Sequence, residues 1–236
     1  MEKVLAQLVE KLNEAFGERL VSVILYGSAA VGDHQQQFSD LNILCVLREI
    51  TTRELADSEP VFKWWRGKGN PAPLLLSECE VRTSTDCFPI EFHDIQARHR
   101  VLYGANIVTD IAVDESFYRA QVEHELRAKV LRLRQKAGGL LSDKDLLRQL
   151  LADSVSTFAV LFRHALVLQG LEVKMLKREV IEQAREAFGI DPVPFLKLLD
   201  LRDQVVKPRD VDPVPLLEQY LKQISVVIDA VDAMEK

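Results

Sequence analysis

Residues 20–47 read LVSVILYGSAAVGDHQQQFSDLNILCVL, and the rest of the chain is interpreted outward from this stretch. Its first seven residues, Leu20 to Tyr26, are apolar and rich in β-branched side chains, which predicts a buried strand. Gly27 ends that strand, and a second strand is predicted from Asp40 to Leu47. A strand, a glycine turn and a second strand follow one another here, and the turn and the start of the second strand carry the polar residues Ser28 and Asp40.

The rest of the first half continues the alternation of helices and strands. An amphipathic helix is expected over residues 3–16, and a further helix between residues 48 and 70. Leu74 to Leu76 predicts a third short strand. Residues 88–93, which read FPIEFH, alternate apolar and polar side chains and predict a fourth. This pattern indicates a small mixed α/β (or α+β) sheet with flanking helices.

The second half has a different character. A helical period runs through five segments, with glycines or prolines between them: 115–137, 142–169, 175–188, 192–206 and 213–234. No strand pattern follows the first half. We therefore expect one domain over residues 1–112 and an all-α helical bundle over residues 113–236.

Composition narrows the class of protein. The 236 residues are 47% hydrophobic and 28% charged, as in ordinary globular proteins, and charged residues interrupt every long apolar run. The net charge of −6 argues against a nonspecific nucleic-acid binder, which usually has a basic face. Three cysteines without metal-ligand spacing fit a reducing compartment, so we expect a cytoplasmic protein with no membrane span. The oligomeric state stays open, a homodimer included.

The glycine turn could bind phosphate. Gly27 lets the backbone turn sharply and approach a ligand, and the amides near Ser28 would open a helix start that attracts anions. Because side chains alternate along a strand, Asp40 and Asn42 share one face of the second strand. Taken alone, this glycine turn is better explained as an ordinary strand-to-helix connection.

Glu91 is the third candidate of the site. In the expected fourth strand its neighbours Ile90 and Phe92 face the opposite way, toward the core. If the strands adjoin, Asp40, Asn42 and Glu91 meet, and acidic groups beside a phosphate site indicate Mg²⁺. We interpret Asp94 as the N-cap of a segment starting at Ile95, not as a ligand.

These motifs resemble the nucleotidyltransferase superfamily of the DNA polymerase β type, and in particular the bacterial aminoglycoside and minimal nucleotidyltransferases. The resemblance is carried by Tyr26-Gly27-Ser28, then Ser39-Asp40-Leu41-Asn42, then Pro89-Ile90-Glu91-Phe92. It implies that Gly27 and Ser28 bind the phosphates of ATP or another nucleoside triphosphate. It also implies that Asp40 and Glu91 are catalytic and, with Asn42, bind Mg²⁺. Many members carry a C-terminal helical bundle that binds the acceptor.

The resemblance implies one further nucleotide contact, and the sequence departs from the family pattern at two positions. Related proteins often have a lysine of the helical domain facing the nucleotide, which makes Lys177 a nucleotide-binding candidate; a solvated basic helix start explains it equally well. Asn42 stands where the family has a second acid, and an amide supplies no charge to a metal. Val31 stands where relatives often have an arginine.

Two functions therefore follow as hypotheses, with a purely structural protein as a third. The first is a Mg²⁺-dependent nucleotidyltransferase that moves a nucleoside monophosphate, AMP from ATP, to a hydroxyl of a small-molecule or protein acceptor. The second, motivated by Asn42 and Val31, is a catalytically impaired nucleotide-binding or regulatory protein that keeps the fold. The acceptor and the nucleotide base are not specified by the sequence.

Overall fold

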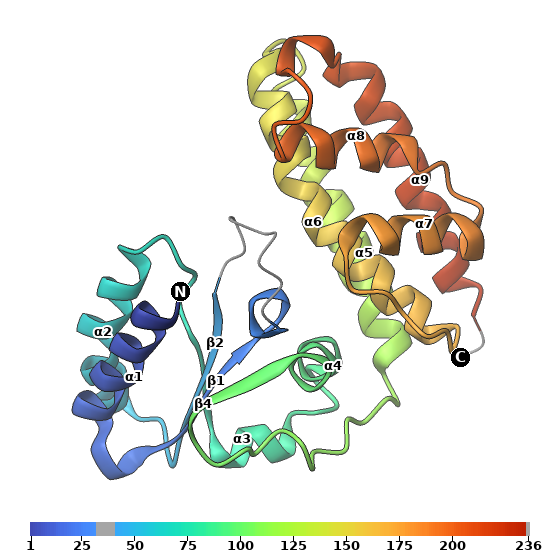
Figure 1. Cartoon of the computed structure of the whole chain (residues 1–236). Helices are drawn as coiled ribbons and strands as arrows, with labels where there is room; N and C mark the ends of the chain where they lie inside the picture. The colour runs from blue at the N-terminus through green and yellow to red at the C-terminus, as the bar shows by residue number, and fades with distance from the viewer. Residues whose placement is uncertain (32–40, 235–236) are drawn as a thin grey trace. The chain divides into compact units, whose positions relative to one another are not determined.

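The computed structural model describes residues 1–31 and 41–234, apart from the side chains of Ser28 and Val31 (Figure 1). The described chain divides into two compact units, Met1–Phe117 and Tyr118–Lys236. The first contains all of the described strands and the second is helical. The expected order, a small mixed sheet followed by a helical bundle, is confirmed.

The first unit is built on a four-stranded sheet with the order β3-β2-β1-β4. The central strand β1 pairs antiparallel with both β2 and β4, whereas β2 and β3 are parallel and joined through helix α2. The strands are β1 (Leu20–Tyr26), β2 (Asn42–Leu47), β3 (Leu74–Ser77) and β4 (His99–Gly104).

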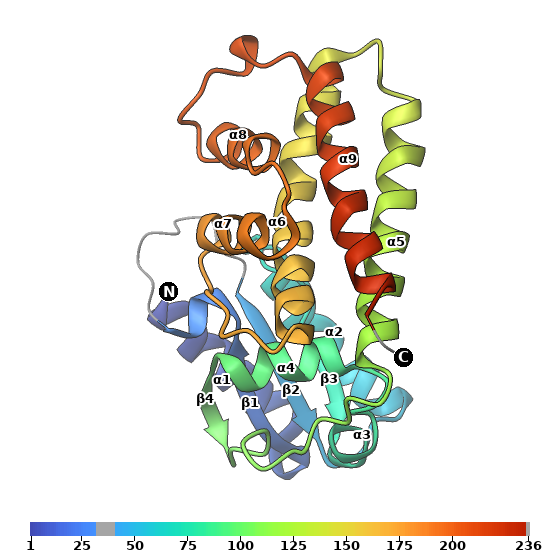
Figure 2. The same ribbon diagram turned by 90° about the vertical axis from the view of Figure 1, so that its right-hand side faces the viewer.

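Helices cover both faces of this sheet. Helices α1 (Glu2–Phe16) and α2 (Thr52–Arg66) pack on one face against Val23, Leu25 and Cys45. Helices α3 (Glu78–Thr83) and α4 (Pro89–Ala97) cover the other face, which carries Ile24, Leu44 and Val46 (Figure 2). Alternation along the strands divides the apolar side chains between the two layers.

The strand expected at Phe88–His93 is wrong. Pro89 begins helix α4, where a proline costs nothing because the first N–H of a helix has no intrahelical partner. Phe92 and Ile95, three residues apart, are both buried against the sheet, as a helix face requires. The fourth strand of the sheet is β4, which was not predicted because all but its last residue are partly buried and its apolar residues do not alternate.

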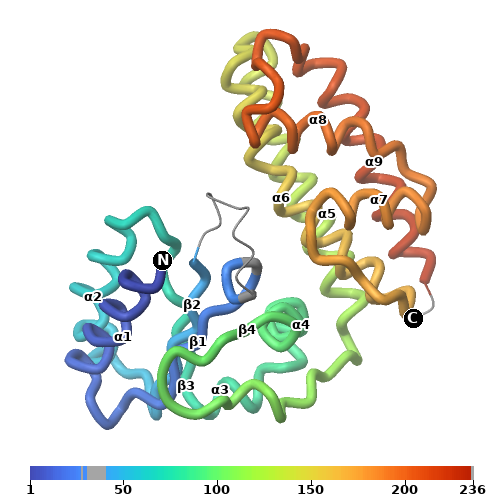
Figure 3. The backbone as a smooth tube through the Cα atoms, viewed as in Figure 1, coloured from blue at the N-terminus to red at the C-terminus, as the bar shows by residue number. Residues whose placement is uncertain are grey.

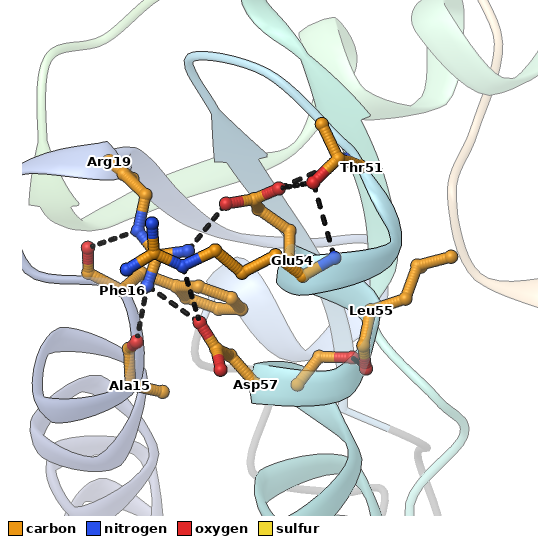
Figure 4. A network of polar contacts seen from close by, with 9 residues as sticks. Ala15, Phe16, Arg19, Thr51, Glu54, Leu55 and Asp57 are labelled. Atoms are coloured by element: carbon orange, nitrogen blue, oxygen red, sulfur yellow. Dashed lines mark hydrogen bonds and ion pairs between the residues drawn. The ribbon is translucent and has the colours of Figure 1, made fainter.

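A polar cluster fixes α2 beside the start of β1 (Figure 4). Arg19 bonds Glu54 and, at 2.7 Å, Asp57 of α2, and it also donates to the Ala15 carbonyl at 2.9 Å. Glu54 in turn accepts from Thr51, the N-cap of α2, in a capping box. Together these bonds hold the pKa of Glu54 down at about 2, with the Thr51 side chain the largest cause and Arg19 the next.

In the second unit, α5, α6 and α9 contact one another, and α7 and α8 pack on α6 (Figure 3). Its core includes edge-to-face contacts of Phe162 and Tyr220 with Phe195. The helices are α5 (Tyr118–Gly138), α6 (Lys144–Leu168), α7 (Lys177–Phe188), α8 (Val193–Arg202) and α9 (Pro213–Asp232).

Helix α6 bears on the expectation that the chain has no membrane span. Within the described residues it is the single helix long and apolar enough to cross a membrane by length and composition. However, 56% of its most apolar window is buried inside the protein, among the side chains of the neighbouring helices. Its apolar character is therefore explained by its place at the centre of the bundle.

Candidate active site at the end of strand β1

Gly27 forms the turn at the end of β1, where the strand passes into the short 3-10 helix η2 (Ser28–Val31). Its φ of +81° lies in the left-handed region that favours glycine. Its N–H donates to the Arg98 carbonyl at 2.9 Å, and its carbonyl accepts from the Ala30 N–H at 3.1 Å. The sharp turn expected from the sequence is present, while the Ser28 side chain lies outside the described part.

Asn42 begins β2 directly opposite Tyr26, the last residue of β1. It shares the face of β2 that carries Leu44 and Val46, and this is the face that α4 covers. A Cβ atom placed on Gly27 would lie 3.3 Å from Asn42 Nδ2. The side chain of Asn42 therefore lies beside the glycine turn, and its expected role as a metal ligand stays a prediction.

Glu91 reaches this face from a helix and not from a strand. It lies in the first turn of α4 with an exposed side chain, while the next residue, Phe92, is buried against β1 and β2. The charges of Glu91 and Asp94 both act on the Tyr26 hydroxyl, which places the two carboxylates near the end of β1. Glu91 therefore lies on a helix where a strand was expected, and its meeting with Asp40 and Asn42 stays a prediction.

Asp94 is not an N-cap. It lies inside α4, one turn after Glu91, and its half-buried side chain is on the site side of the helix. Burial raises the pKa of Tyr26, and the charge of Asp94 and then that of Glu91 raise it further, because each negative charge opposes ionisation of the phenol. The Tyr26 hydroxyl therefore stays protonated and can donate a hydrogen bond.

His99 lies beside Tyr26 on the side opposite to Asn42, so the three side chains form a row across the sheet. It begins β4 opposite Tyr26 and lies on the same face, two residues before Val101. Its Nδ1 is 3.0 Å from the Ile95 carbonyl and its Nε2 is 3.1 Å from Asn106 Nδ2. Nδ1 therefore carries the proton, and His99 fastens the last turn of α4 to the edge of the sheet.

Three of the predicted site residues are not placed in this arrangement: Asp40, Ser28 and Lys177. Asp40 lies outside the described residues, and so do the side chains of Ser28 and Val31. Lys177 is the first residue of α7 and is half-buried in the second unit. In the described ranges, 1–31 and 41–234, no three His, Cys, Asp or Glu side chains form a group that could hold a metal. Gly27, Asn42 and Glu91 are the predicted residues that the described sheet end carries.

Two features of the site were not recognised in the sequence. Tyr26 was quoted only as part of the glycine motif, although its position at the strand end, two residues after Ile24, places it on the face of the site. Asp94 was assigned to a helix start because α4 was expected to be a strand. The three-residue spacing from Glu91 to Asp94 is the signal that would have identified a shared helix face.

Comparison with known proteins finds a solved structure with a similar fold. No protein-family model and no curated protein matches the sequence. Among solved structures, the chain is similar to spectinomycin adenyltransferase AAD(9) from Enterococcus faecialis, whose crystal structure contains ATP and spectinomycin. The TM-score is 0.61 at 12% sequence identity, and the match covers 98% of this chain and 99% of that one. The fold is that of a nucleotidyltransferase.

The match includes the sheet unit and the helical unit together, because it covers nearly all of both chains. A helical second half is therefore part of this nucleotidyltransferase fold and not a separate addition. With the fold in place, the end of β1 combines a glycine turn, an amide side chain, a protonated phenol and two carboxylates. Such a set can bind phosphate through donors and a hard cation through oxygen atoms.

Proposed function

We propose that the protein is a nucleotidyltransferase that transfers AMP from ATP to a hydroxyl group of a small-molecule acceptor. One observation carries the proposal: within a nucleotidyltransferase fold, the face at the end of β1 carries Gly27, Asn42 and Glu91. Gly27 and Ser28 bind the nucleotide phosphates in this proposal. Glu91 acts as the general base that accepts the proton of the acceptor hydroxyl, which suits an exposed carboxylate.

Mg²⁺ is the cation that this chemistry calls for, since it neutralises the charge that develops on the transferred phosphoryl group. The residues that would hold it are Asp40, Asn42 and Glu91. The described donors fit a hard cation, because the carboxylates of α4 and the amide of Asn42 offer oxygen atoms and no sulfur. Asn42 contributes no charge, so the proposed site binds the cation more weakly than a site with three acids.

The acceptor is proposed from the comparison and from charge. The similar adenyltransferase was solved with spectinomycin, a small molecule, and the net charge of −6 suits a cationic acceptor. Lys177, the first residue of α7, is retained as a proposed nucleotide contact. A Lys177→Ala variant that binds ATP as tightly as wild type would remove Lys177 from this site.

Asn42 also favours a second function, a protein that binds nucleotide without turning it over. Its amide stands opposite Tyr26 where a carboxylate would serve two cations, and removal of one charge-stabilising group costs about 10²- to 10³-fold in rate. A regulatory or sensing protein could retain the turn and lose the transfer. The two functions share ATP binding and differ only in the release of pyrophosphate.

Pyrophosphate release tests the proposal. The protein would be incubated with ATP and Mg²⁺ or Mn²⁺, alone and with a panel of hydroxyl acceptors that includes spectinomycin. Release that depends on both cation and acceptor supports the transferase. Cation-dependent ATP binding without release, across the panel, supports the second function. Absence of ATP binding in calorimetry contradicts both.

A further inference from the structure

Three side chains form a row across the end of the sheet, on the face that α4 covers. Tyr26 of β1 stands in the middle, paired with Asn42 of β2 on one side and with His99 of β4 on the other. Directly paired residues of antiparallel strands point to the same face and lie within contact distance. The row therefore begins beside the Gly27 turn and ends at the edge strand.

The polar atoms of the three side chains differ in their hydrogen-bond partners. Both ring nitrogens of His99 are engaged, with the Ile95 carbonyl and with Asn106. The Asn42 amide lies against Gly27. The hydroxyl of Tyr26, by contrast, has no hydrogen-bond partner among the described residues, and the residue is half-buried. The hydroxyl is not among the buried unpaired atoms of the described residues, so it is open to an acceptor from outside the protein.

The ring and the hydroxyl of Tyr26 have separable roles. The ring packs with Ile24 and Phe92 in the core layer beneath α4. A phenylalanine would make the same apolar contacts, so the packing does not require the hydroxyl. A tyrosine phenol is protonated at neutral pH, so its hydroxyl can donate a hydrogen bond to a phosphate oxygen.

We propose that Tyr26 is a further substrate-binding residue, whose hydroxyl donates a hydrogen bond to a phosphate oxygen of the bound nucleotide. The inference rests on the proposed function. Tyr26 directly precedes Gly27, so a nucleotide whose phosphates contact the glycine turn brings acceptor oxygens to this hydroxyl. A neutral donor suits this position, because it binds phosphate without forming an ion pair with the carboxylates of Glu91 and Asp94.

The affinity for ATP tests this role. Calorimetry with Mg²⁺·ATP would compare wild type, Tyr26→Phe and the control Tyr103→Phe, which removes a hydroxyl from β4 on the layer packed against α1 and α2. We expect Kd to rise about tenfold in Tyr26→Phe, the effect of one hydrogen bond to a charged group, and to stay unchanged in Tyr103→Phe. Equal affinity of Tyr26→Phe and wild type overturns the inference. Lack of ATP binding by wild type overturns the proposed function itself.

A spectroscopic measurement keeps the test independent of the variant's folding. The chain has four tyrosines, so protein labelled with 3-fluorotyrosine gives four fluorine resonances, assigned by single Tyr→Phe variants. ATP should shift the Tyr26 resonance and leave that of Tyr103 in place. A Tyr26 resonance that does not move while ATP is bound contradicts the hydrogen bond.

Discussion

Asn42 occupies the space beside Gly27 across the β1–β2 pair: a Cβ on Gly27 would stand 3.3 Å from Asn42 Nδ2. The turn that the proposal assigns to phosphate thus adjoins the residue at which the resemblance implies a second acid. Gly27 also has a φ of +81°, so two independent constraints disfavour a side chain there. The local geometry of the site is therefore coupled to the choice of residue at position 42.

Replacement of Gly27 by alanine should destabilise the first unit. The left-handed φ costs a non-glycine residue roughly 1–2 kcal/mol, and the contact with Asn42 adds to this. Gly69→Ala is the matched control, because Gly69 has a φ of +84° and nothing within 4 Å of the added Cβ. Chemical denaturation should show a larger loss of unfolding free energy for Gly27→Ala than for Gly69→Ala. Equal losses would mean that the contact with Asn42 carries no energy.

Replacement of Asn42 by aspartate tests the metal position. A carboxylate beside Glu91 and Asp94 should raise the affinity for Mn²⁺ or Mg²⁺ about tenfold, since ligand charge sets the affinity for hard cations. Without cation the variant should be less stable than wild type, because like charges then repel. Asn13→Asp, an exposed change of the same charge on α1, is the control. Unchanged cation affinity together with lower stability would make Asn42 a structural residue.

Glu54 should make the free energy of unfolding depend on pH in the acidic range. Its pKa falls from the ordinary 4.5 to about 2 in the folded protein. Its contribution is therefore fully present above pH 4.5 and is lost as the pH falls toward 2. Glu54→Gln should be less stable than wild type at pH 7, and the difference should shrink between these two pH values. A difference that stays constant from pH 7 to pH 2.5 in urea denaturation would contradict this account.

The central part of the sheet could be predicted from sequence, since Leu20–Tyr26 agrees with β1 in full and the second strand reaches the same last residue, Leu47. These strands are buried on both faces, and continuous apolar runs identify such strands. The helices of the second half could be predicted from the helical spacing of their apolar residues and from the glycines and prolines between them. The prediction of a strand at Phe88–His93 was wrong, because an alternation over six residues does not distinguish a strand from a short helix that begins at Pro89.

For the candidate site, the sequence could predict which face of a strand a residue shares, but not how the elements meet. Asp40 and Asn42 were placed on one face of the second strand, and that inference needs only the alternation of side chains. Glu91 was selected for its acid, and the structure brings it over the same face by a helix. The spacing of Tyr26 from Ile24 identifies the face on which it lies, whereas its place directly beside Asn42 follows from the antiparallel register of β1 and β2.

The measurement that tests the central claim most directly is transfer of labelled AMP from α-labelled ATP, made with wild type and Glu91→Gln side by side. Glutamine keeps the size of the exposed side chain and cannot act as a base, so thermal stability should be preserved. The account predicts Mg²⁺-dependent transfer by wild type and a loss of about 100-fold or more in Glu91→Gln, with ATP still bound. Transfer at the same rate by both proteins would contradict it.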